Sequence, residues 1–236
     1  MIKGILFDKD GTLIEFNSLW IDSTYEFLKN ITQIHNQESK LEELAFKIGL
    51  EGQTVREDSA LAGKTSADLA DIISNVLMVD FDGILKELNH FYYQKIKENP
   101  EKIKPVCNLS ALFTQLKSNG LKIGIVTADN YDVTKYILEV LQLLEYVDFI
   151  ATADLYERKP HVEALQVFCH QQNLELDEVI HIGDTSIDME FSKHCLYGVG
   201  VLTGVGSASL LSTYTPYVLN NVADLIDHDG KVTFPA

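Results

Sequence analysis

Short runs of consecutive apolar residues recur along the chain, and each run leads into polar residues. The runs cover residues 2–7, 122–126, 147–151, 179–183, 197–202 and 217–219, and they lead toward Asp8, Thr127, Asp154, Asp184, Thr203 and Asn220. Apolar runs of this length that lack polar alternation are typical of strands in a parallel sheet buried on both faces. The pattern therefore predicts a parallel sheet whose strands end in polar residues at one edge.

Helical patterns separate these runs from about residue 105 onward. Helices are predicted over residues 110–119, 131–143 and 161–173, because apolar residues recur there at helical spacing on one face. This alternation of strands and helices indicates an α/β fold with a doubly wound, Rossmann-like parallel sheet. Ligands of such sheets bind at the carboxyl ends of the strands, which is where the polar residues lie.

Residues 16–100 break the alternation, since only helical patterns occur in them. Helices are expected over residues 18–30, 38–48, 66–77 and 81–98. We expect residues 1–15 and 101–236 to form the α/β catalytic core and residues 16–100 to form an inserted, all-helical cap domain. An insert that directly follows the turn after the first strand is well placed to act as a lid.

The composition and the charge restrict the class of protein. Of the 236 residues, 46% are hydrophobic and 23% are charged, as in ordinary globular proteins. Acidic residues outnumber basic residues 35 to 19, and the net charge of −16 argues against nucleic acid and membrane surfaces as partners. An anionic substrate then requires a local reversal of this sign by a metal ion or by placed cations.

Further features of the sequence bear on the compartment. The chain has no apolar run long enough to cross a membrane, and its first residues reach an acidic pair too early for a signal peptide. The three cysteines are widely separated and lack metal-ligand spacing, which indicates free thiols in a reducing compartment. We expect a cytoplasmic protein, and a monomer because a lid has to move against the core.

The first predicted strand ends in the segment Asp8-Lys9-Asp10-Gly11-Thr12-Leu13. The carboxylates of Asp8 and Asp10 lie on the same side of an extended chain, because side chains alternate along it. Close carboxylates repel each other unless a cation or a shared proton compensates their charge. The segment does not fit a calcium-binding EF-hand loop, since Leu13 stands where a third oxygen ligand is required.

Three later segments are expected at the same edge of the predicted sheet: Thr127, Lys159-Pro160 and Gly183-Asp184-Thr185-x-x-Asp188. The site then combines several carboxylates with one hydroxyl and one ammonium group. Carboxylate oxygens suit Mg²⁺, which often bridges to a substrate phosphate. Such an ion and Lys159 offset the local negative charge and make room for a phosphoryl group.

In this order, and with the insert after the first of them, the four segments resemble the four motifs of the haloacid dehalogenase-like superfamily. The arrangement is similar to its phosphoglycolate phosphatase-like branch, which carries a helical cap at this place. The resemblance implies that Asp8 is a nucleophile that forms an aspartyl-phosphate and that Asp10 is the general acid and base. It also implies a Mg²⁺ cofactor on Asp8, the backbone carbonyl of Asp10 and Asp184, with Asp188 as a ligand or as a partner of the ligands.

The same resemblance assigns Thr127 and Lys159 to the oxygens of the phosphoryl group. Dehalogenases of the superfamily lack the second acid, so Asp10 favours phosphoryl transfer. The expected function is that of a Mg²⁺-dependent phosphatase, a phosphoric monoester hydrolase, acting on a small phosphorylated metabolite. A phosphosugar mutase of the β-phosphoglucomutase type stays open as the alternative enzyme. A receiver-like phospho-acceptor module is the alternative outside enzymes, although such modules are shorter and have no helical lid.

Residues 58–65 approximate a nucleotide-binding Walker A sequence, but Asp58 replaces its first glycine and no strand precedes it. We interpret the segment as a turn in which Thr65 or Ser66 caps the following helix. The resemblance implies that a loop of the cap in this region reaches the substrate. Lys64 and Arg56 are therefore candidates for contact with the distal group of the substrate.

Two further polar residues lie at or within predicted strands. Lys9 takes the middle place of the first motif, where an apolar residue is common in the superfamily, and the sequence leaves the direction of its side chain open. His181 lies within a predicted core strand, and the seven histidines show no metal-ligand spacing. We expect His181 to be a hydrogen-bonded core residue.

Overall fold

The structure is a computed structural model that describes residues 1–227 and 231–234. Its main sheet has the strand order β5 (Phe149–Ala151), β4 (Lys122–Val126), β1 (Gly4–Phe7), β6 (Val179–Gly183), β7 (Tyr197–Val201) and β8 (Val218–Leu219). Every neighbouring pair of strands in this sheet is parallel, which confirms the predicted doubly wound sheet. The chain moves outward from β1 to β5 on one side and to β8 on the other, so β1 lies at the topological switch point, where ligands of open α/β sheets bind.

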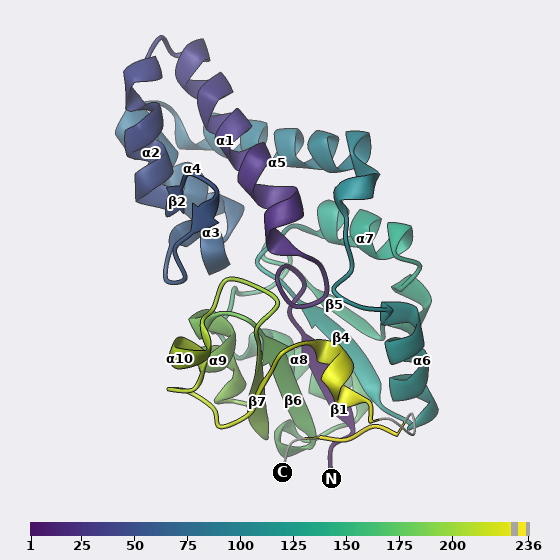
Figure 1. The fold of residues 1–236 in the computed structure, drawn as a ribbon. Coiled ribbons are helices and arrows are strands. Elements are labelled where there is room, and N and C mark those ends of the chain that lie inside the picture. The colour runs from purple at the N-terminus through teal and green to yellow at the C-terminus, as the bar shows by residue number, and fades with distance from the viewer. Residues whose placement is uncertain (228–230, 235–236) are drawn as a thin grey trace.

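Helices cover both faces of this sheet (Figure 1). They are α6 (Leu109–Ser118), α7 (Tyr131–Val140), α8 (Glu163–Gln172), α9 (Ser186–Ser192) and α10 (Ala208–Leu211), with short 3-10 turns at Leu144–Tyr146, Leu176–Glu178 and Val222–Leu225. Ile5 and Phe7 of β1 pack in one apolar cluster with residues of α6, whereas Leu6 packs in another with residues of α8 and α9. Successive side chains of a strand point to opposite faces, so a continuous apolar strand requires this double cover.

Residues 16–98 form a second group of helices above the carboxyl ends of the strands, while the N-terminus lies at the opposite edge of the sheet (Figure 1). The group comprises α1 (Phe16–Ile34), a 3-10 turn at Glu38–Lys40, α2 (Leu41–Ile48), α3 (Ala60–Gly63), α4 (Ser66–Leu77) and α5 (Phe81–Glu98), and a 3-10 turn at Pro100–Lys102 follows. No strand of the main sheet comes from residues 16–100. The division of the chain into a core and a cap at these residues stays a prediction.

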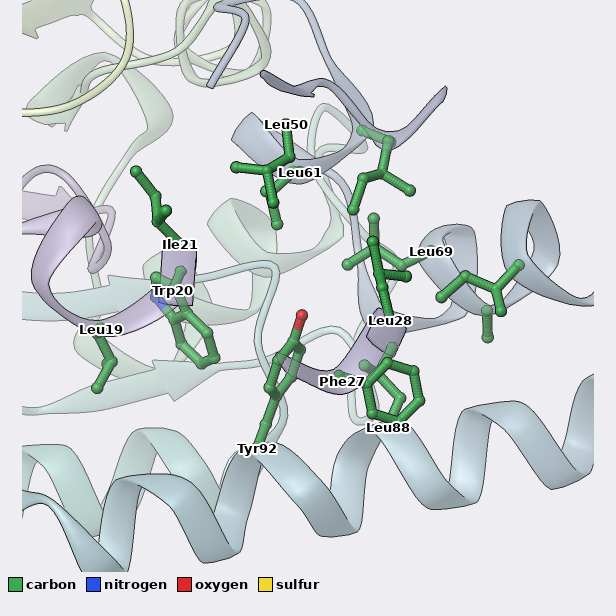
Figure 2. Packing of buried hydrophobic residues seen from close by; sticks show 14 of the residues in the cluster. Leu19, Trp20, Ile21, Phe27, Leu28, Leu50, Leu61, Leu69, Leu88 and Tyr92 are labelled. Carbon is green, nitrogen blue, oxygen red and sulfur yellow. The ribbon is translucent and has the colours of Figure 1, made fainter. Parts of the chain in front are cut away.

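The helices above the sheet share one apolar cluster, part of which Figure 2 shows. Trp20 of α1 packs edge-on against Tyr92 of α5 with ring centroids 4.9 Å apart, and Phe27 packs against Phe91 at 5.4 Å. The cluster also includes Val133 and Ile137 of α7. Aromatic pairs of this geometry add to the hydrophobic contribution of burial. The cluster therefore joins the helices to one another and to a helix that flanks the sheet.

Residues 16–100 contain one pair of short strands, whereas only helices were expected there. β2 (Leu50–Glu51) and β3 (Thr54–Val55) form a small antiparallel hairpin after α2. Gly49 ends α2 with a φ of 97°, and Gly52 turns the hairpin with a φ of 62°, in the left-handed region that glycine tolerates best. Strands of two residues are too short to show a periodic pattern, which is why the sequence did not reveal them.

Among the described residues, no helix combines the length and the apolar character needed to cross a bilayer.

The central strand yields a test of stability. Leu6 is fully buried and packs directly over Gly124 of β4, where an added Cβ would lie 2.5 Å from Leu6 Cδ2. We expect Leu6→Ala to lower the free energy of unfolding by about 2–5 kcal/mol, because the tightly packed surroundings cannot close the cavity. Leu155→Ala, at a side chain that is 59% exposed, is the matched control and should change it by less than about 0.5 kcal/mol. Urea titration of both variants measures the difference, and equal losses would contradict this account of the core.

Candidate active site

The carboxyl edge of the sheet brings most of the predicted site residues together. Asp8 follows β1 directly, Thr127 follows β4 and Asp184 follows β6, and the parallel register aligns these three strand ends. A cavity lies between this edge and the helices above. It is lined from the sheet side by Asp8, Asp10, Thr127, Asp129, Lys159 and Asp188, and from the helices by Phe16, Trp20, Lys64, Leu69 and Tyr92.

Lys159 connects two of the carboxylates. Its Nζ lies 2.6 Å from Asp8 Oδ1 and 2.6 Å from Asp188 Oδ1, and the side chain is 5% exposed. Burial opposes the charged form of a lysine, but the charges of Asp188 and Asp8 outweigh it and raise the pKa of Lys159. Lys159 is therefore a permanent cation at the point where Asp8 faces the cavity.

Asp188 holds Lys159 in place. Its Oδ1 accepts hydrogen bonds from Lys159 and from His181 Nε2 at 2.9 Å, and its Oδ2 accepts from the backbone N–H and the hydroxyl of Thr185. Although burial raises it, the cation of Lys159 and the bond from His181 bring the pKa of Asp188 below its usual value. His181 is buried and hydrogen-bonded, as expected.

Thr185 and Asp188 also form the capping box that begins α9. Each oxygen of the Asp188 carboxylate thus has two donors. The residue is better placed to orient Lys159 than to supply a free lone pair to a metal ion.

Asp184 is fully buried. Its Oδ1 accepts a hydrogen bond of 3.1 Å from the Thr12 hydroxyl, and its Oδ2 accepts one of 2.9 Å from the backbone N–H of Val205. Glycines surround it closely: a Cβ on Gly11 would lie 2.5 Å from Asp184 Oδ2, and one on Gly204 would lie 1.8 Å from it. Burial, together with the charges of Asp8 and Asp188, raises the pKa of Asp184 well above its usual value.

The carboxylate group fits a divalent cation. One oxygen from each of Asp8, Asp184 and Asp188 lies within 4.8 Å of the others. When all three carboxylates are ionised, the single charge of Lys159 leaves the cluster with a net charge of −2. Without a metal ion, burial raises the pKa of Asp8 to about 7, an effect that Lys159 opposes and that Asp188 and Asp10 support. Oxygen ligands with this charge deficit suit Mg²⁺. Asp8 and Asp184 have the oxygens with the fewest other donors.

Asp10 does not join this group with its side chain. Its Oδ2 accepts a hydrogen bond of 2.5 Å from Lys9 Nζ, and its Oδ1 accepts one of 2.6 Å from the indole N–H of Trp20. Lys9 is 1% exposed, and its Nζ also lies 3.1 Å from Asp129 Oδ2. The direction of Lys9, which the sequence left open, is thus into the protein and toward two carboxylates.

The sequence analysis did not single out Asp129. It lies two residues after Thr127, and its backbone N–H donates to the Thr127 hydroxyl at 3.2 Å. Burial raises the pKa of Asp129 to about 6, although Lys9 opposes this effect. Asp8 and Asp184 are predicted site residues because they follow apolar strands. Asp129 also follows an apolar strand closely, so the same criterion could have identified it.

The two candidate residues from the insert have different positions. Lys64 lines the cavity between α3 and α4, where Ser59 caps α3 and Thr65 caps α4. Arg56 points elsewhere: its guanidinium lies over the Phe46 ring, donates to the Phe46 carbonyl at 3.0 Å and is 3.5 Å from Glu51 Oε1. The structure therefore brings Lys64 to the site and does not bring Arg56 there.

Fold and cavity together define the class of protein: an α/β enzyme with a carboxylate cluster and a buried lysine at the ends of parallel strands. The sequence model of the haloacid dehalogenase-like hydrolase family matches residues 5–199, and the chain belongs to this family. Pyrophosphatase PpaX of Bacillus mycoides (strain KBAB4) is 26% identical over 231 residues, which cover 95% of each chain.

Solved structures of the same fold agree with this assignment. A predicted phosphoglycolate phosphatase from Haemophilus somnus superposes with a TM-score of 0.71 at 18% identity, covering 95% of this chain and 96% of its own. A β-phosphoglucomutase from Clostridium difficile superposes with a TM-score of 0.68 at 20% identity, covering 97% and 95%. At such identities the likeness concerns the fold, including the helices above the sheet.

The raised pKa of Asp8 predicts a dependence of stability on pH. Between pH 4 and 7 the folded, metal-free protein keeps a proton on Asp8 that the unfolded chain has released, so this group favours folding less as the pH rises. The free energy of unfolding should fall by up to about 1.4 kcal/mol per pH unit from this group. Asp8→Asn removes it, while His181, whose lowered pKa acts in the opposite direction, stays in both proteins. Urea titrations across this range in EDTA measure the two slopes, and equal slopes would contradict the assignment.

Proposed function

We propose that the protein is a Mg²⁺-dependent phosphatase that hydrolyses a small phosphorylated metabolite through an aspartyl-phosphate on Asp8. One observation carries the proposal: Asp8, at the end of the switch-point strand, lies 2.6 Å from the buried cation of Lys159 and within 4.8 Å of the other two aspartates. A carboxylate in this setting faces the cavity and has a fixed positive charge beside it. Phosphoryl transfer needs in-line positioning of a nucleophile and neutralisation of the phosphoryl oxygens.

Asp8 and Lys159 divide the work of the first step. Lys159 binds Asp8 Oδ1, which leaves Oδ2 to attack phosphorus. Of its three N–H donors, the one that binds neither Asp8 nor Asp188 is available to a phosphoryl oxygen. The P–O bond to the leaving group breaks as the bond to Asp8 forms, and the Thr127 hydroxyl at the cavity wall supports another oxygen. Asp10 protonates the leaving oxygen, then takes a proton from the water that hydrolyses the aspartyl-phosphate.

The carboxylates of Asp8 and Asp184 would hold the metal ion, with the backbone carbonyl of Asp10 as the ligand that the family resemblance implies. Bound there, Mg²⁺ would supply positive charge that offsets the carboxylates and the phosphoryl group. Asp188 would act beside them by fixing Lys159. The net charge of −16 for the whole chain makes such local compensation necessary for an anionic substrate.

The far side of the cavity indicates the kind of leaving group. The apolar and aromatic residues Leu69, Trp20 and Tyr92 line this side together with Lys64. We propose that residues 16–100 act as a cap and that Lys64 contacts an anionic distal group of a small substrate. The relatives named as pyrophosphatases make inorganic pyrophosphate one candidate, and phosphoglycolate and sugar phosphates are others.

A substrate screen tests the proposed function. We expect release of phosphate from at least one member of a panel of pyrophosphate, phosphoglycolate, sugar phosphates and p-nitrophenyl phosphate, with Mg²⁺ and not with EDTA. Asp8→Asn should lower kcat by at least about 10³-fold, because an amide is not a nucleophile. Retention of a tenth of kcat, a barrier change of only about 1.4 kcal/mol, would rule out the covalent role. Formation of an isomerised sugar phosphate without free phosphate would rule out hydrolysis as the main reaction.

A Lys64 variant and an Arg56 variant test whether Lys64 contacts the distal group of the substrate. Lys64→Ala should lower kcat/KM for an anionic substrate of the panel about tenfold, or about 1.4 kcal/mol, through KM. The same variant should leave hydrolysis of p-nitrophenyl phosphate nearly unchanged. Arg56→Ala removes a cation from the same segment outside the cavity and is the matched control. Steady-state kinetics of both variants decide the matter, and equal effects on both substrates would exclude Lys64 from distal recognition.

A further inference from the structure

Lys9 stands between the two aspartates of the first motif, and neither the proposed chemistry nor the family resemblance gives it a role. We propose that Lys9 is a positioning residue: held by Asp129, it fixes the Asp10 carboxylate in the orientation that proton transfer requires. The proposal rests on the proposed function, since it concerns the acid and base of that reaction.

The burial of Lys9 is the first observation. The side chain is 1% exposed, although lysine is among the residues that are almost never fully buried unless paired. Its Nζ has two carboxylate partners, Asp10 Oδ2 at 2.5 Å and Asp129 Oδ2 at 3.1 Å, and lies 5.6 Å above the centre of the Trp20 ring. The two carboxylates together fix the position of the Lys9 ammonium group.

The anchoring of Asp129 is the second observation. Its Oδ1 accepts a hydrogen bond of 2.8 Å from the backbone N–H of Asn130, its carbonyl accepts one of 3.0 Å from Ala153, and its own N–H donates to Thr127 Oγ1. Asp129 is thus fixed to the loop after β4. Lys9 therefore joins the loop after β1, which carries Asp8 and Asp10, to the loop that carries Thr127.

The position of Trp20 completes the arrangement. Its indole N–H donates from helix α1 to Asp10 Oδ1 at 2.6 Å, whereas Lys9 binds the other oxygen, Oδ2. Each oxygen of Asp10 has a donor that is itself packed or ion-paired, so rotation of the carboxylate breaks one bond or the other. Misplacement of a reacting group by about 1 Å can cost about 10²-fold in rate, which gives the size of the effect to expect.

A purely structural ion pair would behave differently from a positioning residue. Loss of a structural pair lowers stability and slows the reaction of every substrate to the same extent, both in the wild-type protein and in an Asp10 variant. Loss of a positioning residue affects only what Asp10 does, and the effect disappears when Asp10 itself is changed. It also falls most on substrates whose leaving oxygen needs a proton, since p-nitrophenolate leaves without one.

A double-mutant cycle uses these differences. Lys9→Met, and the pair Lys9→Met with Asp129→Asn, are each made in the wild-type protein and in Asp10→Asn. The pair avoids leaving the buried Asp129 carboxylate without its cation, which would itself destabilise the fold. The control pair Lys117→Met with Asp148→Asn removes a lysine–aspartate ion pair of 2.7 Å that lies outside the cavity lining. Thermal unfolding confirms that each protein is folded.

The readout is the rate of phosphoenzyme formation, by rapid quench, from p-nitrophenyl phosphate and from an alkyl phosphate that the wild-type protein hydrolyses. We expect both Lys9 variants to slow formation from the alkyl phosphate by about 10- to 100-fold, to affect p-nitrophenyl phosphate much less, and to add no further loss in Asp10→Asn. Asp129→Glu, which keeps the charge, should retain part of the rate that the pair loses.

Three results would overturn the inference: additive losses in the Asp10→Asn background, equal losses for both substrates, or a loss from the control pair as large as that from Lys9. None of these three results concerns hydrolysis of phosphate esters by the wild-type protein, so none of them contradicts the proposed function. Absence of turnover in the wild-type protein on every phosphate ester of the panel would overturn the proposed function and this inference together.

Discussion

The contact of the Lys159 ammonium with Asp8 and Asp188 is the interaction on which the site depends. Parallel strands of a doubly wound sheet end at one edge, and in this chain their ends carry aspartates that repel one another once buried. Without a buried cation, charges this close would not stay ionised together. Lys159 compensates one of the three negative charges of the fully ionised cluster. The two charges that are left without a counter-charge make the cluster suitable for a divalent ion.

The same principle explains why an acidic protein can handle an anion. The net charge of −16 describes the whole chain, whereas the side chains of two lysines at the site, Lys9 and Lys159, are almost completely buried. Their charges act over short distances in a medium that screens them less than water does. The number of basic residues in a sequence therefore says less about its ligand than the depth at which a few of them lie.

Much of the fold could be predicted from the sequence. The helical period of α4 and α5 and the continuous apolar runs of β4 and β6 carry their own signal, and the observed bounds of these elements are those that the patterns predict. The β2–β3 hairpin and the four-residue α3 could not, since elements of that length show no period. For the site, strand ends predicted that Asp8, Thr127 and Asp184 would lie together. Side-chain direction was beyond the pattern: Lys64 and Arg56 lie in one segment with the same charge, yet local packing on Phe46 takes only Arg56 away from the cavity. The pattern gave no sign of Asp129 as a partner of Lys9, because Lys9 lies in the loop after β1, 120 residues away in the sequence.

The carboxylate of Asp188 begins helix α9 through its bonds to Thr185 and, with its other oxygen, holds Lys159. One side chain thus gives both the first turn of a helix and the cation of the site their positions. Lys159 itself lies on the loop between β5 and α8, but its ammonium group is held by a carboxylate of α9, and α9 packs on β6 and β7. Local fluctuations that open the cavity can therefore leave the nucleophile and its counter-charge assembled, ready for successive substrate molecules.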